Sequence, residues 1–182
     1  MSETASLLDH QSIWGPMAQQ RVFRCLLEAF SYPGRIQSAS LPALLATLGD
    51  SEISLADPDE LVAADDWRRL GARREAADKA NFVVARGDID PAFQPAIGTL
   101  ESPEQGATIL LRVRKLGRGA KLKLSGPGIQ DAIKLAVGGL DPAWLERRAQ
   151  WNAGFPMGVD FILVDGEQFA ALPRTVSIAG EA

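Results

Sequence analysis

The amino-acid sequence predicts an α/β domain built on a mixed β-sheet that is flanked by helices. Segments with the spacing of amphipathic helices alternate along the chain with short apolar runs bounded by turn residues. In the second half, two pairs of strand-like runs are joined by short glycine-containing turns, as in antiparallel hairpins. Helices combined with hairpins favour a mixed sheet in a layered domain.

A single domain is expected over residues 16–182, after a flexible N-terminal arm of residues 1–15. Pro16 begins a helix at the first-turn position that proline favours. The helix ends at Ser31-Tyr32-Pro33-Gly34, because Pro33 cannot continue it. Its apolar stripe consists of Val22, Phe23, Leu26, Leu27 and Phe30.

Shorter elements follow in the first half. We expect a strand at residues 35–38, a helix at 41–48 that ends at Gly49, and a strand at 52–55. Asp57-Pro58-Asp59-Glu60 supplies a capping aspartate, an early proline and acids near the positive helix end, so it predicts a helix that runs to Leu70. Residues 82–84 are expected to form a buried strand, and residues 87–102 a loop.

The second half contains the two expected hairpins. Gly117-Arg118-Gly119 joins residues 107–113 to 120–124, and Asp165-Gly166 joins residues 159–164 to 167–172. The second turn places Asp160 opposite Ala171. Between the hairpins, residues 129–137 are predicted to be helical, and Asp141-Pro142 begins a further helix that runs to about Trp151.

The composition argues against several classes of function. The chain of 182 residues has a net charge of −4, which argues against a general nucleic-acid binder. No apolar run is long enough to span a bilayer, and the first residues lack the basic start of a signal peptide, so a cytoplasmic protein is expected. Cys25 and His10 are the only residues of their kinds, so an internal disulfide is excluded and histidine chemistry is not expected.

A basic segment is the first candidate binding feature. It contains no acidic residue, and its cations are Arg112, Arg114, Lys115, Arg118, Lys121 and Lys123. In the expected hairpin they form a local positive patch that could hold a polyphosphate or an acidic partner. The alternative is an ordinary solvated face of the hairpin.

A glycine turn is the second candidate. Ser125-Gly126-Pro127-Gly128 lies between a predicted strand and a predicted helix, an arrangement that can point backbone N–H groups at an anion. The turn matches neither a Walker A loop nor a dinucleotide fingerprint, and a tight structural turn is the alternative. Together with Lys123 and Arg174, the anion-binding candidates are Ser125, Gly126 and Gly128.

Asp160 and Arg174 form the third constellation. Asp160 shares a strand face with apolar residues and needs a partner if it is partly buried, and Arg174 lies just past the end of the facing strand. A structural ion pair is one interpretation. In the other, Arg174 grips a phosphate or phosphonate oxygen through its planar guanidinium. No pair of active-site carboxylates is visible, so no catalytic residue and no metal ligand is assigned.

Four stretches of the sequence resemble a known family. They are Phe23-Arg24-Cys25-Leu26-Leu27-Glu28-Ala29-Phe30-Ser31-Tyr32-Pro33-Gly34, Gly98-Thr99 with Pro103-Glu104-Gln105-Gly106-Ala107-Thr108, Leu122-Lys123-Leu124-Ser125-Gly126-Pro127-Gly128-Ile129, and Phe155-Pro156-Met157-Gly158-Val159-Asp160 through Leu172-Pro173-Arg174-Thr175. In this order they resemble the H-type subunit of the bacterial carbon–phosphorus lyase system, which degrades phosphonates.

The resemblance implies a fold similar to the pyridoxal-phosphate-dependent transferases, without the cofactor, and a homodimer that assembles with other carbon–phosphorus lyase subunits. The family's complex takes ATP and an alkyl phosphonate and forms a ribose 1-alkylphosphonate 5-triphosphate. A different subunit then cleaves the C–P bond with an iron–sulfur cluster, and a single cysteine here agrees with that division.

Three functions are compatible with the sequence. The chain is a non-catalytic structural subunit of the complex, an accessory subunit that binds ATP or phosphonate at an interface, or a free-standing enzyme that binds a phosphate-bearing ligand. The first is favoured by the single histidine and by the lack of a motif that marks a Schiff-base lysine.

Overall fold

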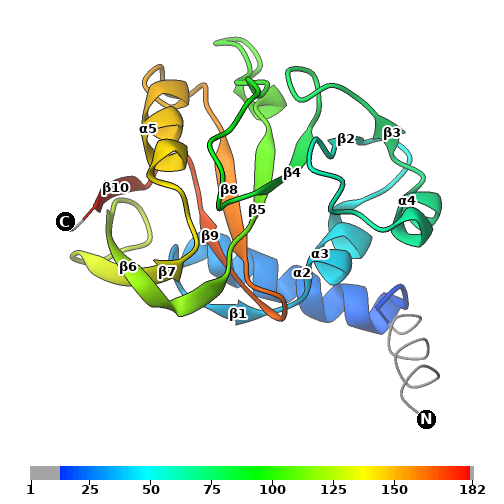
Figure 1. Cartoon of the computed structure of the whole chain (residues 1–182), viewed down its shortest axis with the longest axis horizontal. Coiled ribbons are helices and arrows are strands. Elements are labelled where there is room, and N and C mark those ends of the chain that lie inside the picture. Colours follow the sequence, from blue (N-terminus) through cyan, green and yellow to red (C-terminus); the bar gives the residue numbers. More distant parts are fainter. Residues whose placement is uncertain (1–12, 181–182) are drawn as a thin grey trace.

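The computed structural model describes residues 13–180, and most of the expected N-terminal arm, with His10, lies outside these residues (Figure 1). A central seven-stranded sheet has the order β1-β9-β8-β5-β4-β2-β3. Its members are β1 (Gln37–Ser38), β2 (Ser54–Ala56), β3 (Arg73–Arg74), β4 (Phe82–Arg86), β5 (Thr108–Arg112), β8 (Asp160–Val164) and β9 (Gln168–Leu172). Strands β8, β5, β4, β2 and β3 are parallel, whereas β9 and β1 pair in antiparallel fashion, so the predicted mixed sheet is confirmed.

Helices and a small second sheet cover the two faces of the central sheet. The helices are α2 (Pro16–Ser31), α3 (Leu41–Leu48), α4 (Ala64–Leu70) and α5 (Pro142–Trp151), with a short 3₁₀ turn, η1 (Pro103–Gln105). Residues of α2, α3 and α4 pack on one face. The other face is covered by α5 and by an antiparallel sheet of order β10-β6-β7, made of β10 (Ser177–Gly180), β6 (Lys115–Ser125) and β7 (Ile133–Gly138).

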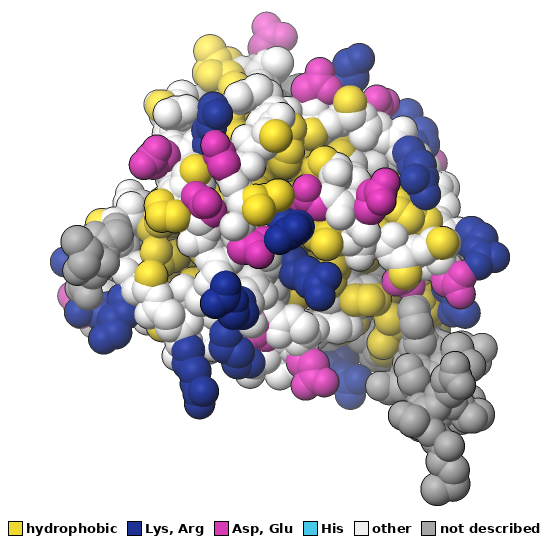
Figure 2. All heavy atoms as spheres, in the orientation of Figure 1, with side chains coloured by type: hydrophobic (Ala, Val, Ile, Leu, Met, Phe, Trp, Pro, Cys, Tyr) yellow, Lys and Arg dark blue, Asp and Glu magenta, His cyan; other side chains and the backbone are white. Residues whose placement is uncertain are grey.

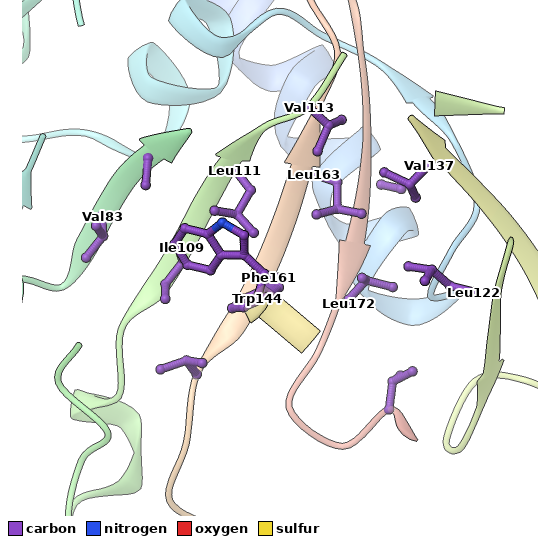
Figure 3. Close-up of a cluster of buried hydrophobic side chains, with 14 of the residues drawn as sticks. Val83, Ile109, Leu111, Val113, Leu122, Val137, Trp144, Phe161, Leu163 and Leu172 are labelled. Carbon is purple, nitrogen blue, oxygen red and sulfur yellow. The ribbon is translucent and has the colours of Figure 1, made fainter. Parts of the chain in front are cut away.

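The central strands are buried on both faces, which explains their continuous apolar sequences. In β5, Ile109 and Leu111 contact the core on the α5 side, whereas Leu110 contacts the core on the α2 side. Trp144 of α5 is fully buried and makes edge-to-face contacts with Phe161 and other rings (Figure 3). Its indole N–H donates to the Ile89 carbonyl at 2.8 Å, so the buried polar atom has a partner.

The first half follows the sequence prediction, except that α4 begins later than expected and that β3 was not expected. The helix expected from Asp57 begins only at Ala64. The Asp57 carboxylate caps a loop instead, because it accepts from the backbone N–H groups of Leu61 at 2.8 Å and Val62 at 3.0 Å. Glu60, with φ of 54°, is left-handed and cannot continue a helix from Asp57.

The hairpin expected at Gly117-Arg118-Gly119 is wrong. These residues lie inside β6, which continues from Lys115 to Ser125 and pairs with β7 and β10 rather than with β5. The register shifts between Leu116 and Ala120, where Gly117 and Gly119 have φ of 79° and 116°. The two glycines therefore form an irregularity within one strand and do not reverse the chain.

The helix expected at residues 129–137 is also wrong, because β7 occupies Ile133–Gly138. Leu135 and Val137 are buried, whereas Ile133 and Lys134 are exposed. From residue 134 onward burial follows the two-residue period of a strand that covers a core with one face.

The final hairpin is confirmed, with its turn one residue later than expected. Asp165 N–H donates to the Gln168 carbonyl at 2.9 Å, and Gly166 has φ of 79°. Ala171 consequently pairs with Ile162 and not with Asp160. A partner shift of two residues preserves the sheet face, so Asp160 stays on the side predicted for it.

Candidate functional site

Asp160 and Arg174 form an ion pair at the end of the β8–β9 hairpin. The Arg174 guanidinium donates from Nη2 to Asp160 Oδ2 at 2.7 Å and from Nε at 3.2 Å, and the Arg174 backbone N–H donates to Oδ1 at 2.7 Å. The side chains of Arg174 and Asp160 are only 15% and 17% exposed.

The third guanidinium nitrogen of Arg174 is also used within the chain. Nη1 donates to the carbonyl of Pro103 at 2.8 Å and to that of Pro156 at 3.4 Å. A Cβ on Gly106 would clash with the Gly158 carbonyl oxygen and would lie 2.8 Å from Arg174 Nη1, so glycine is required where these segments meet. Arg174 therefore ties three segments together: η1, the loop before β8 and the end of β9. This geometry favours a structural ion pair over the alternative in which Arg174 binds a phosphate or phosphonate oxygen.

Arg148 is a second structural arginine, and sequence reasoning missed it. It is 4% exposed, and its guanidinium donates to the carbonyls of Val176 at 3.0 Å and Pro173 at 2.6 Å. It also stacks over Phe161 at 5.7 Å from the ring centroid. Burial lowers the pKa of Arg148 to about 10, against the opposing attraction of Asp160. Its helical position, next to Arg147 in α5, gave no sequence signal for burial.

The glycine turn packs tightly against neighbouring backbone. Gly126 and Gly128 have φ of 133° and 80°. A Cβ on Gly126 would lie 2.9 Å from the Thr175 carbonyl oxygen, and one on Gly128 would clash with the carbonyl oxygen of Ser31. Strand β7 follows the turn in place of the expected helix, so the predicted cradle at a helix N-terminus does not form. Anion binding by Ser125, Gly126 and Gly128 stays a prediction.

The structure divides the basic segment into two regions. Lys121, Lys123 and Ser125 are exposed on β6, where Lys123 pairs with Lys134 of β7. Figure 2 shows Lys and Arg side chains gathered in the region of β6 and β7 at the lower left. Arg112 and Arg114 lie elsewhere, at the carboxyl end of β5. The candidates Lys123 and Arg174 lie on different elements, Lys123 on β6 and Arg174 after β9, and their joint role in anion binding stays a prediction.

Charged residues gather where four parallel strands end. Arg86, the last residue of β4, pairs with Arg112, the last residue of β5, and Arg112 pairs with Val164 at the end of β8. Asp59 follows β2, and Asp165 follows β8. In open α/β sheets, ligands bind outside the carboxyl ends of the strands.

A cavity of about 650 Å³ opens at this edge. We call it the carboxyl-edge cavity; its walls are Asp59, Leu61, Arg86, Asp88, Arg112, Val113, Arg114, Asp165 and Gly166. Its volume falls within the range of about 300–1,000 Å³ that is typical of small-molecule sites.

Most of the charges in the carboxyl-edge cavity have partners. Arg86 donates to both oxygens of Asp88 at 3.0 Å, and its backbone N–H donates to Asp59 at 2.7 Å. The hydrogen bond from Arg86 lowers the pKa of Asp88, and the positive charge of Arg114 lowers it further. Asp165 Oδ2 accepts from Lys115 Nζ at 2.9 Å and from the backbone of β6.

Arg112 and Arg114 differ from these residues. Both are exposed, and the side chain of neither makes a hydrogen bond or an ion pair with any of residues 13–180. The sequence signal for this site is an apolar run that ends on charged residues, as in Val83-Val84-Ala85-Arg86 and Leu110-Leu111-Arg112. That signal indicates a site only once the strands are known to be parallel neighbours.

Among the residues that the structure describes, no cluster of three or more potential metal ligands occurs. Within the same residues, no helix combines the length and hydropathy that crossing a membrane requires.

Comparison with known proteins decides the family. Residues 12–179 match the family described as bacterial phosphonate metabolism protein (PhnH). The chain belongs to the PhnH family. The resemblance carried by the four sequence stretches is thereby confirmed.

Two relatives with assigned names support this membership. The chain is 48% identical over 172 residues to HtxG of Stutzerimonas stutzeri, which is named as a candidate C–P lyase subunit; the match covers 91% of this chain and 88% of that protein. It is 33% identical over 183 residues to the PhnH subunit of alpha-D-ribose 1-methylphosphonate 5-triphosphate synthase from Rhizobium meliloti (strain 1021), over 89% and 90% of the two chains.

Proposed function

We propose that this chain is a structural subunit of a carbon–phosphorus lyase complex in organic phosphonate catabolism. It supports the formation of ribose 1-alkylphosphonate 5-triphosphate from ATP and alkyl phosphonate, a reaction whose reactive groups lie on other subunits. The observation that carries this proposal is the family match, which extends over nearly the whole chain, residues 12–179.

The use of the buried charges supports a structural role. Asp160, Arg174 and Arg148 all bind segments of the same chain, and together they fix the turn between β9 and β10. We extend the proposal to a cytoplasmic location and to a likeness with pyridoxal-phosphate-dependent transferase folds without the cofactor.

Helix α2 offers a surface for assembly. Phe23 and Leu27, four residues apart and therefore on one face of α2, are 51% and 54% exposed; we call this pair the α2 row. Large apolar side chains on an uncovered helix face are typical of protein interfaces. We propose that this α2 row forms the homodimer contact.

Co-purification tests the proposed function. The tagged full-length chain is co-expressed with the other lyase subunits, and the eluted complex is analysed by mass. We expect the subunits to elute together, and we expect the isolated chain to leave ATP and methylphosphonate unchanged. Release of adenine by the isolated chain, or failure of the subunits to co-elute, contradicts the proposal.

A double substitution tests the α2 row. Phe23→Glu with Leu27→Glu places two charges on the proposed contact and should abolish dimerisation, while the unfolding temperature changes little because both residues are exposed. Loss of co-elution with an intact dimer would assign the row to another subunit instead. Leu100→Glu is the control, since Leu100 is 70% exposed on a different segment. Equal assembly of both variants removes α2 from the interface.

A second role is accessory binding of nucleotide or phosphonate. The residues proposed for it from the sequence are Lys123, Ser125, Gly126, Gly128 and Arg174. If the chain is instead a free-standing enzyme, a pull-down from phosphate-starved cells yields no lyase subunits.

A further inference from the structure

The carboxyl-edge cavity contains two guanidinium groups that form no ion pair with any of residues 13–180. Arg112 is the last residue of β5, and Arg114 lies at the bend two residues further on; both residues are exposed and both line the cavity. Arg86 and Lys115, the other cations at this edge, are each held by an aspartate. Asp88 attracts Arg114 but is hydrogen-bonded to Arg86, so an anion between Arg112 and Arg114 would further offset the repulsion between these two like charges.

We propose that the carboxyl-edge cavity binds a small molecule through a single dianionic phosphate or phosphonate group, held by Arg112 and Arg114. Each guanidinium presents a planar pair of donors that matches two oxygens of such a group. This assignment adds a ligand to the proposed scaffold role. It uses residues other than the anion-binding candidates drawn from the sequence.

The walls of the cavity define the rest of the ligand. Asp59 and Asp88 lie beside the two arginines, so a chain of several phosphates would meet carboxylates as well as cations. Leu61 and Val113 offer apolar contact to an uncharged substituent. A small alkylphosphonate or a phosphate monoester therefore fits better than a triphosphate.

The same walls disfavour a macromolecular anion. Nucleic acid presents many phosphates, and a chain of net charge −4 with aspartates at the rim repels them. Carboxylates of a partner protein are a different occupant, which the experiment distinguishes from a small ligand.

Calorimetry on the full-length chain tests the proposal. Methylphosphonate, inorganic phosphate, AMP and ATP are titrated separately into the unmodified protein at low ionic strength. We expect saturable binding of methylphosphonate, phosphate or AMP, with ATP weaker than AMP. If none of the four binds saturably, or if ATP binds more tightly than AMP, the proposal is overturned.

Variants then assign the residues. Arg112→Ala and Arg114→Ala should each weaken binding about tenfold or more, as expected for loss of a charge-assisted bidentate contact. Arg118→Ala is the matched control, because Arg118 is an exposed arginine of the same basic segment that lies outside the cavity walls. It should bind within about twofold of the unmodified chain. Equal weakening by all three variants would show a general charge effect and overturn the assignment.

Two further measurements separate ligand binding from partner binding. Arg112→Lys with Arg114→Lys keeps both charges but removes the planar forks, so it should bind more weakly than the unmodified chain and keep its unfolding temperature. Co-elution with the lyase subunits is measured in parallel. If the alanine variants lose co-elution while ligand binding is unchanged, the two arginines serve a partner protein and the proposal fails, whereas the proposed scaffold function stands.

Discussion

The ion pair between Asp160 and Arg174 makes a quantitative prediction about stability. Arg174→Ala removes a guanidinium that donates to Asp160 and to the carbonyls of Pro103 and Pro156. The Asp160 side chain, 17% exposed in the intact pair, then keeps the backbone N–H of residue 174 as its hydrogen-bond donor and the more distant charge of Arg148. A buried charge that loses its partner typically costs about 3–5 kcal/mol, so the lower end, about 3 kcal/mol, applies to this slightly exposed pair.

Asp160→Asn should cost less. An asparagine oxygen still accepts from the backbone N–H of Arg174, so that contact survives, and about 2 kcal/mol of destabilisation is expected from the loss of the carboxylate charge. In the double variant the two losses overlap. Its loss of free energy of unfolding should be about 1–3 kcal/mol smaller than the summed losses of the two single variants.

Urea unfolding followed by circular dichroism measures these differences, with Arg174→Lys as the control that keeps the charge without the fork. For a chain of this size, about 3 kcal/mol corresponds to a fall of roughly 6–12 °C in the unfolding temperature. Additive effects of Arg174→Ala and Asp160→Asn, or losses below about 0.5 kcal/mol, would refute the inference that the pair fixes the hairpin end.

Three more outcomes follow from the same structure. Gly128→Ala should lower the free energy of unfolding in urea by several kcal/mol more than Gly166→Ala. Both glycines have φ near 80°, but only at Gly128 would the new Cβ clash with neighbouring atoms. Similar losses of stability in the two variants would contradict this. Arg148→Ala should cost about 3 kcal/mol, because the buried guanidinium that bridges the carbonyls of Val176 and Pro173 is lost. Burial lowers the pKa of Arg148 to about 10, so unfolding takes up a proton above that pH. The free energy of unfolding of the unmodified chain should therefore rise relative to that of Arg148→Ala between about pH 9 and 11. Asp88→Asn removes a negative charge from the cavity wall and should raise the affinity of the carboxyl-edge cavity for methylphosphonate several-fold in calorimetry. Weaker binding would count against the proposed site.

Local signals explain what could be predicted from the sequence. Helix α2 begins at Pro16 and ends beside Pro33, and each end depends on the chemistry of one or two residues. The β8–β9 hairpin depends on the glycine of one turn. The contact between Asp160 and Arg174 was accessible for the same reason, because the hairpin alone brings the two residues together.

The wrong predictions occur where local signals conflict with tertiary pairing. Glycines at 117 and 119 fit a hairpin turn as well as an irregularity inside a strand, and the difference lies in whether β6 pairs with β5 or with β7. Residues 129–137 form an apolar run that is too short to separate a helical period from a strand period. In both cases strand pairing within the β10-β6-β7 sheet determines the local structure. No short stretch of sequence encodes that pairing.

The carboxyl-edge cavity shows a stronger limit of sequence reasoning. Its walls come from four segments between Asp59 and Gly166, which meet only because β2, β4, β5 and β8 lie side by side in parallel. The charged residues that end each strand were visible in the sequence. Their convergence was not, because parallel neighbours are joined by long crossovers that give no sign of strand order.

The α2 row and the carboxyl-edge cavity share no residue, which makes assembly and ligand binding separable. Glutamates at Phe23 and Leu27 should remove assembly and leave methylphosphonate binding intact, and alanines at Arg112 and Arg114 should do the reverse. The core offers one route of coupling, since α2 and the interior of β5 belong to the same hydrophobic cluster. A different result is that each pair of substitutions impairs both assembly and ligand binding in a fully folded chain. The hydrophobic cluster would then transmit the effect between α2 and β5. A purely structural role in the complex would no longer explain such a result.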